Sequence, residues 1–199
     1  MATAITAKDV SELRARTGAG MMDCKKALEE SQGDMEKAIE FLRKKGIAKA
    51  DKRTGRETKE GIIGHYLHHN GKLAVLVEIN CETDFVARTD DFKNLARAVA
   101  EHIAAAAPLA VDEAGVDATV LEREKRIAEE QAAASGKPAN IVEKIATGKV
   151  ESFLKEVTLV NQPWVREPSK TVGELVKEVS AKTGEAIQVR RFVRLALGE

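Results

Sequence analysis

The spacing of apolar residues changes along the chain, and this spacing predicts strands in some segments and helices in others. Between residues 73 and 79, large apolar residues occupy every second position, as in a strand whose alternate side chains point to opposite faces. These residues are Leu73, Val75, Val77 and Ile79, and Ala74, Leu76 and Glu78 lie between them. From residue 92 to 103, apolar residues recur at three- and four-residue steps, which predicts an amphipathic helix. Residues 82–88, with the sequence ETDFVAR, should therefore join a core strand to a core helix.

Phe85 within this heptapeptide has two possible placements. Flanked by Asp84 and Arg88, the ring either packs beneath the following helix and closes the core, or faces outward. Most apolar side chains are at least partly buried, so spacing alone favours the placement in the core.

The first 46 residues predict three short helices separated by clear breaks. The first contains Val10 and Leu13 and ends at residues 17–20, a Thr-Gly-Ala-Gly turn. The second covers 21–31 and stops at Gly33, which suits a left-handed cap. Asp34 caps the third, and Gly46 is expected to close it. Helices this short are marginal alone, so they should pack together as a compact module.

The rest of the chain predicts a small sheet and several helices. A β-hairpin is expected over 61–80 with its turn at Asn70-Gly71, because Asn-Gly is a strong signal for a two-residue turn. One helix is expected to end at Ala107, because Pro108 stops it. Further helices are expected over 120–134, 138–148, 150–157 and 172–182, with Pro138 in a first turn and Gly148 at an end. Residues 158–168 are expected to be less regular. A final strand has Ile187, Val189, Arg191, Val193, Leu195 and Leu197 at every second position. Three strands that do not alternate regularly with helices indicate an α+β fold.

Composition restricts the possible partners. The chain has 199 residues, and its 32 Lys and Arg residues balance 32 Asp and Glu residues, which argues against a protein that coats nucleic acid. Residues 43–56 are nevertheless strongly basic. They are interpreted as a solvated helix end running into a linker, because charge runs are usually solvated and no aromatic residue is interleaved for base stacking. Contact with RNA or with an acidic protein surface is the alternative.

Other functional classes find little support. No apolar run is long enough to cross a bilayer, and residues 1–10 have no signal-peptide core. Cys24 and Cys81 form no CxxC pair, which favours free buried thiols in a reducing, cytoplasmic setting. A single disulfide between them is the alternative. No glycine-rich phosphate cradle or serine-nucleophile motif occurs. His65, His68 and His69 with Cys81 lack an evident fourth metal ligand, so they are interpreted as solvated hairpin histidines. No cofactor and no enzymatic activity are expected.

Met21 and Met22 suggest a partner-binding surface. Consecutive residues of a helix point in different directions, so both side chains are not expected in the core. Methionine is common on adaptable binding surfaces. An outward methionine beside the glycine turn therefore points modestly to a partner.

Two longer stretches resemble a known family. Residues 13–28, LRARTGAGMMDCKKAL, are similar to the opening signature of elongation factor Ts, and residues 80–88, NCETDFVAR, to its second signature. The stretches 136–138 (GKP) and 162–165 (QPWV) follow the same family pattern. The resemblance spans almost the whole chain.

The resemblance implies a guanine nucleotide exchange factor that drives GDP off elongation factor Tu. It also implies an α+β fold in which residues 1–53 form a ubiquitin-associated-like three-helix module with a basic linker. Residues 54–199 would then form the core and dimerisation domain, with a small antiparallel sheet of about three strands packed with helices. In the family, Arg14, Met21 and Met22 at the matching positions face the GTPase. Asp84 and Phe85 match the pair that pushes in beside its magnesium and phosphate region.

Thr83, Val86 and Arg88 complete the second signature and support its shape. On this basis Phe85 is expected to be exposed and functional, which reverses the placement favoured by spacing. Neither His68 nor His69 is assigned a contact, because the alignment of that loop is loose.

The resemblance also bears on partners. Elongation factor Tu supplies the nucleotide site, so no cofactor, nucleic-acid contact or membrane is expected. Longer family members carry a second copy of the core and a coiled-coil insertion, whereas one copy of the core is recognised here. A homodimer, or a two-plus-two complex with the partner, is therefore expected. The alternatives are an RNA- or ribosome-binding module using 43–56 and 190–194, a generic helix-groove binder, and a metal enzyme using the histidines.

Overall fold

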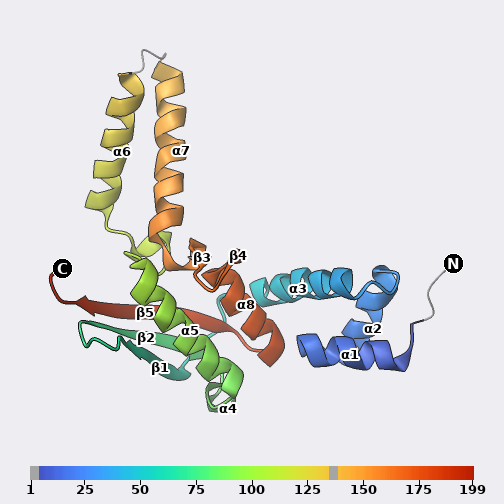
Figure 1. Cartoon of the computed structure of the whole chain (residues 1–199). Coiled ribbons are helices and arrows are strands. Elements are labelled where there is room, and N and C mark those ends of the chain that lie inside the picture. Colours follow the sequence, from blue (N-terminus) through green and yellow to red (C-terminus); the bar gives the residue numbers. More distant parts are fainter. Residues whose placement is uncertain (1–4, 135–138) are drawn as a thin grey trace.

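The chain forms an N-terminal group of three helices, an α+β core and a projecting pair of helices (Figure 1). This computed structural model describes residues 5–134 and 139–199. The helices are α1 (Ala7–Thr17), α2 (Met21–Glu30), α3 (Met35–Asp51), α4 (Asp84–Ala87), α5 (Asp90–Ala106), α6 (Ala118–Ala133), α7 (Ala139–Val157) and α8 (Val172–Thr183). The strands are β1 (Glu60–Leu67), β2 (Leu73–Cys81), β3 (Pro163–Trp164), β4 (Glu167–Thr171) and β5 (Ile187–Ala196). Short 3-10 turns cover Glu113–Gly115 and Leu159–Asn161, and the predicted α+β class is confirmed.

The three N-terminal helices enclose a small apolar cluster of their own. Leu13, Cys24 and Leu28 are fully buried at its centre. α1 starts with a capping box between Thr6 and Asp9 and ends at Gly18, whose φ of 69° is left-handed. The helix boundaries in this region follow from capping chemistry that the sequence displays.

The predicted end of α3 at Gly46 is wrong, because the helix continues to Asp51. The glycine instead lies where α3 crosses α8. A Cβ atom at Gly46 would lie 3.0 Å from Cβ of Ala181, closer than most side-chain contacts. Two small residues thus let the helices approach, and this packing offsets the low helix propensity of glycine.

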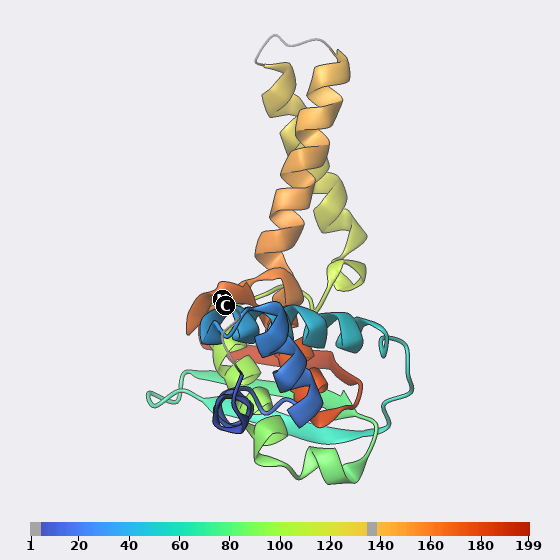
Figure 2. The same ribbon diagram turned by 90° about the vertical axis from the view of Figure 1, so that its right-hand side faces the viewer.

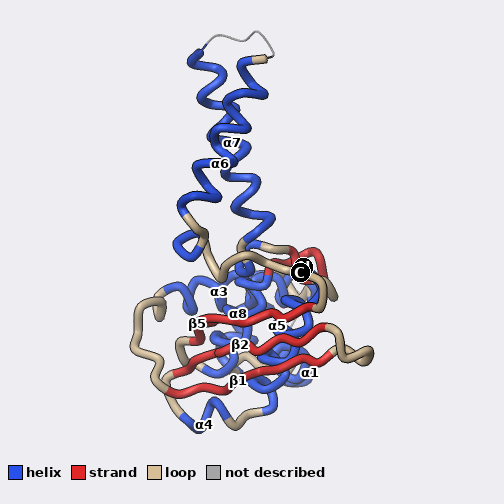
Figure 3. Tube along the Cα trace, turned by 90° about the vertical axis from the view of Figure 1, so that its left-hand side faces the viewer, coloured by secondary structure: helices blue, strands red, loops and turns tan. Residues whose placement is uncertain are grey.

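The sheet has the order β1-β2-β5, with every pair antiparallel. Val75, Val77 and Ile79 point to one face, where they pack with residues of α5 and α8. Leu76 points to the other face and is exposed, so the predicted alternation in this strand is confirmed. Figure 3 looks onto this second face, in front of the helices.

The β1–β2 hairpin is present, but its turn is wider than the two residues predicted. Residues 68–72 lie between the strands, and the Gly71 N–H donates to the His68 carbonyl oxygen at 2.8 Å. Gly71 therefore occupies the last position of a four-residue turn, where its φ of 68° suits glycine.

A β-bulge changes the faces of β5. Val189 opposes Ile79 and is buried, whereas Arg191 opposes Glu78, so Arg190 is the extra residue. Beyond the bulge, Val193 and Leu195 point to the exposed face. The regular two-residue spacing in the sequence conceals this switch, because a bulge shifts the faces by one residue.

α6 and α7 lie side by side and project from the core as an arm (Figures 1 and 2). Ala128, Ala132 and Ala146 are buried in the arm. The predicted helix end at Gly148 is wrong, since α7 runs unbroken from Ala139 to Val157. The predicted break at 135–136 and the predicted first turn at Pro138 lie outside the described residues.

The buried His102 of α5 forms hydrogen bonds with the segment that follows the arm. Nε2 of His102 lies 2.9 Å from Oε1 of Gln162, and Nδ1 accepts the Val165 N–H at 3.3 Å. Burial lowers the pKa of His102, so the ring is uncharged at neutral pH. The short β3–β4 hairpin follows Gln162, in the segment for which no regular structure was predicted.

Candidate partner-binding site

The heptapeptide after β2 forms a single helical turn, α4, at the end of the sheet nearer the N-terminal helices (Figure 1). Thr83 caps it by accepting the Val86 N–H at 3.5 Å. Val86 and Ala87 are buried, whereas the Phe85 side chain is 77% exposed. The placement of Phe85 in the core is therefore wrong, because Val86 and Ala87 face the core at this turn.

Asp84 is partly exposed beside Phe85. Its Oδ2 lies 2.7 Å from a guanidinium nitrogen of Arg88, one turn further along the chain. Arg88 is largely exposed, so this ion pair is screened by water and can exchange for another partner at little cost. α4 thus presents an aromatic ring and a carboxylate to solvent.

The loop that enters α4 is tied to the loop between α8 and β5. Glu185 accepts the N–H groups of Glu82 and Thr83 at 3.1 and 3.0 Å, and the Thr83 hydroxyl at 2.6 Å. In return, Glu82 accepts the Ala186 N–H at 2.6 Å, and this bond lowers the pKa of Glu82. No local pattern in the sequence points to Glu185, because it lies more than 100 positions from the motif that it contacts.

Cys81 ends β2 and is buried directly behind this loop. Its Sγ donates to the Thr83 carbonyl oxygen at 3.1 Å. Burial, followed by the charge of Glu185, raises the pKa of Cys81 to about 11. The thiol is therefore protonated at neutral pH and poorly suited to act as a nucleophile or a metal ligand.

Both methionines at the start of α2 are exposed, Met21 by 52% and Met22 by 77%. Gly20 precedes them as the N-cap residue, and Arg14 of α1 is also exposed. Figure 2 views the molecule from the side of these helices, with α4 below them. The predicted site residues thus lie in two places, one on the N-terminal helices and one at α4, where Thr83 is partly buried and Val86 is buried.

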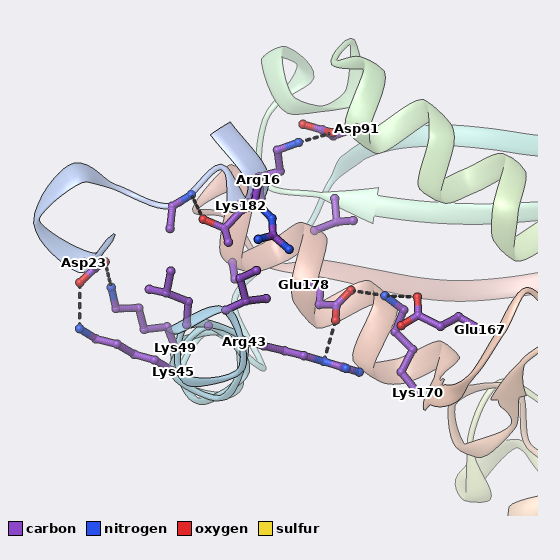
Figure 4. A pocket seen from close by; sticks show the side chains of 17 residues that line it. Arg16, Asp23, Arg43, Lys45, Lys49, Asp91, Glu167, Lys170, Glu178 and Lys182 are labelled. Carbon is purple, nitrogen blue, oxygen red and sulfur yellow. Dashed lines mark hydrogen bonds and ion pairs between the residues drawn. The ribbon is translucent and has the colours of Figure 1, made fainter. Parts of the chain in front are cut away.

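The basic stretch 43–56 is not a solvated linker for most of its length. Arg43 pairs with Glu178 at 2.8 Å, and Lys45 and Lys49 each lie 2.8 Å from a carboxylate oxygen of Asp23 (Figure 4). Arg53 donates to the Ser180 carbonyl oxygen at 3.0 Å. Arg43, Lys45 and Lys49 hold α3 against α2 and α8, around a cleft of about 520 Å³.

The histidines near the hairpin tip contact one another and a tyrosine. His68 Nδ1 lies 2.8 Å from the Tyr66 hydroxyl, and its ring centroid lies 4.2 Å from that of His69. Within 5–134 and 139–199, no group of three His, Cys, Asp or Glu residues could hold a metal ion. In the same ranges, no helix is long and apolar enough to cross a membrane.

The family model of elongation factor Ts matches residues 2–199. The chain belongs to the elongation factor Ts family. It is 57% identical to the elongation factor Ts of Fervidobacterium nodosum, over 98% of this chain and 99% of that protein. The proteins of the same name from Carboxydothermus hydrogenoformans and Desulfosudis oleivorans are 56% and 53% identical, over 98% of this chain and 90% and 98% of theirs. The elongation factor Ts family acts in translation elongation as the nucleotide exchange factor for elongation factor Tu.

Proposed function

We propose that this protein binds elongation factor Tu carrying GDP and promotes GDP release by inserting α4 beside the magnesium and phosphate region of that partner. The exposed ring of Phe85 carries the proposal. It stands on a turn whose neighbouring apolar side chains are buried, so the ring is held rigidly while its surface remains free. Rigid aromatic anchors that become desolvated on binding supply much of the energy of protein interfaces.

The proposed mechanism is a competition between two ligands of one GTPase. Phe85 separates the elements beside the magnesium ion, and Asp84 disturbs the network around that ion. Binding energy that is available only in the distorted state lowers the affinity for nucleotide, and linkage requires each ligand to weaken the other equally. The exchange factor needs no phosphate cradle, cofactor or catalytic group of its own for this task.

The N-terminal helices supply the second contact in this proposal. Arg14, Met21 and Met22 bind the GTPase, while Thr83 and Val86 maintain the shape of α4. Residues 1–53 act as the GTPase-contacting module, and 54–199 as the core and dimerisation domain. The protein acts in the cytoplasm, without contact to nucleic acid or membrane.

We also propose that two copies associate through the open face of the sheet. Apolar side chains from all three strands are exposed there, namely Ile63, Leu67, Leu76, Val193 and Leu195. Contiguous apolar patches of this kind usually mark an interface. A second copy suits this face, because an apolar patch meets the same patch across a two-fold axis.

The decisive experiment follows release of a fluorescent GDP analogue from elongation factor Tu. The native protein should accelerate release, and Phe85→Ala should weaken complex formation by about 2 kcal/mol or more, roughly thirtyfold. Leu109→Ala is the matched control, since Leu109 is exposed at the base of the arm and outside the proposed contacts. Circular dichroism should show that both variants fold.

Two results would contradict the proposal. A folded Phe85→Ala protein that exchanges GDP at the native rate would rule out the wedge. No acceleration by the native protein would rule out the exchange activity and favour an RNA-binding role, for which a steep salt dependence is expected.

A further inference from the structure

The loop before α4 follows the end of β2, where the sheet no longer offers hydrogen-bond acceptors to the backbone N–H groups. β2 ends at Cys81, so the N–H groups of Glu82 and Thr83 have no strand partner. Backbone donors withdrawn from water need another acceptor. The carboxylate of Glu185 provides it for both groups and for the Thr83 hydroxyl.

The chemistry of this contact favours a carboxylate. Three donors converge on two oxygen atoms, and an ionised carboxylate is a side chain with acceptors only. A glutamine would lose the charge and place its amide NH₂ against the Thr83 hydroxyl, which would then have to accept instead of donate. Hydrogen bonds to a charged acceptor are also shorter and about twice as strong as neutral ones, in agreement with the 2.6 Å contact from Thr83.

Glu185 is itself held in place from behind. Its carbonyl oxygen accepts the Ser180 hydroxyl of α8 at 2.5 Å. Gly184, with a φ of 82°, lets the chain turn sharply from α8 into this loop. The neighbouring Ala186 N–H donates to Glu82, so the two loops clamp each other.

We propose that Glu185 is a positioning residue for the exchange reaction. It sets the direction of Asp84 and Phe85 through Thr83, which caps α4, and it contacts no partner itself. This inference rests on the proposed function. α3 packs against α8, the helix that leads into Glu185. α8 therefore also fixes the distance between the methionines of α2 and the ring of Phe85.

The test compares Glu185→Gln with the native protein in the GDP-release assay. With the carboxylate lost, the maximal rate of release should fall about tenfold, while the concentration for half-maximal release changes less than about threefold. A residue that binds the partner equally before and after the distortion would mainly raise that concentration. Glu113→Gln is the matched control, because Glu113 is exposed on a separate 3-10 turn.

Hydrogen exchange of the free protein supplies an independent readout. In Glu185→Gln, the peptide covering 82–88 should exchange at least about tenfold faster, while α5 and the N-terminal helices keep their native protection. If Glu185→Gln does not fold, Glu185→Asp leaves the Thr83 cap intact and withdraws the carboxylate by one methylene, and the same local loss of protection is expected.

The outcomes separate the inference from the proposed function. A native protein that does not accelerate release refutes the function. If the native protein is active and Phe85→Ala is not, a Glu185→Gln protein with the native maximal rate refutes the positioning role alone. A general loss of protection throughout the core, or a loss confined to partner affinity, would also overturn it.

Discussion

Contacts between residues far apart in the sequence fix several individual side chains of this protein. Asp23 of α2 accepts from Lys45 and Lys49 of α3, and these two bonds lower the pKa of Asp23 to about 2. The folded-state pKa is thus below the ordinary value of 3.8, and the unfolded chain binds the proton more readily. The stabilisation is present above about pH 4 and is lost as the pH falls towards 2.

Replacing Asp23 by Asn should remove this contribution. At pH 7 the free energy of unfolding should fall by about 0.5–1 kcal/mol, a modest amount because the carboxylate is partly solvated. The difference from the native protein should shrink as the pH is lowered from 4 to 2. Urea unfolding followed by circular dichroism at each pH measures it, and a difference that stays constant with pH would contradict the assignment.

Single residues also show what the sequence can predict about the site. Spacing favoured a buried Phe85, and its exposure followed only from the resemblance of residues 80–88 to a family signature. Both methionines were recognised as candidates because adjacent helix positions diverge. Glu185 could not be found in this way, because no local pattern connects it with residues on another loop.

At the level of elements, glycine gave mixed signals, since Gly18 and Gly184 do end helices in a left-handed conformation. Gly46 and Gly148 both predicted helix ends, and both lie inside continuous helices. The propensity cost of one glycine, about 1 kcal/mol relative to alanine, is smaller than the gain from packing a long helix against a neighbour. The predicted cap at Asp34 is confirmed, since its side chain accepts the Lys37 N–H.

The two glycines should respond in opposite ways to alanine. Gly148→Ala should stabilise the protein by about 0.5–1 kcal/mol, since its Cβ would meet nothing within 4 Å. Gly46→Ala should destabilise it, because the new methyl group would press on Ala181. Thermal unfolding of both variants tests this, and shifts of the same sign would show that the α3–α8 crossing is looser than described.

At the scale of the whole molecule, the α+β class was predictable and the arm was not. Periodicity identifies a helix but does not give its direction, so α6 and α7 could equally have packed over the sheet. Instead, one sheet face remains without a helix across it in the described structure, and its apolar centre carries the proposal of a homodimer.

Leu76 offers a direct test of that dimer. It lies on the central strand between His65 and Val193, so Leu76→Lys would place a charge in the middle of the interface. Sedimentation at micromolar concentration should give a dimer for the native protein and a monomer for this variant. Leu109→Lys should remain dimeric, and a monomeric native protein would refute the proposal.

The pairing of β2 with β5 has a consequence for how this chain is made. Glu78 and Arg191 are neighbours across the two strands, although 113 positions separate them. At a synthesis rate of about 5–20 residues per second, β2 waits on the order of ten seconds for its partner. During this interval the nascent chain exposes an unpaired strand edge, which favours association with other chains. This translation elongation factor therefore passes through an aggregation-prone stage while it is being synthesised on the ribosome.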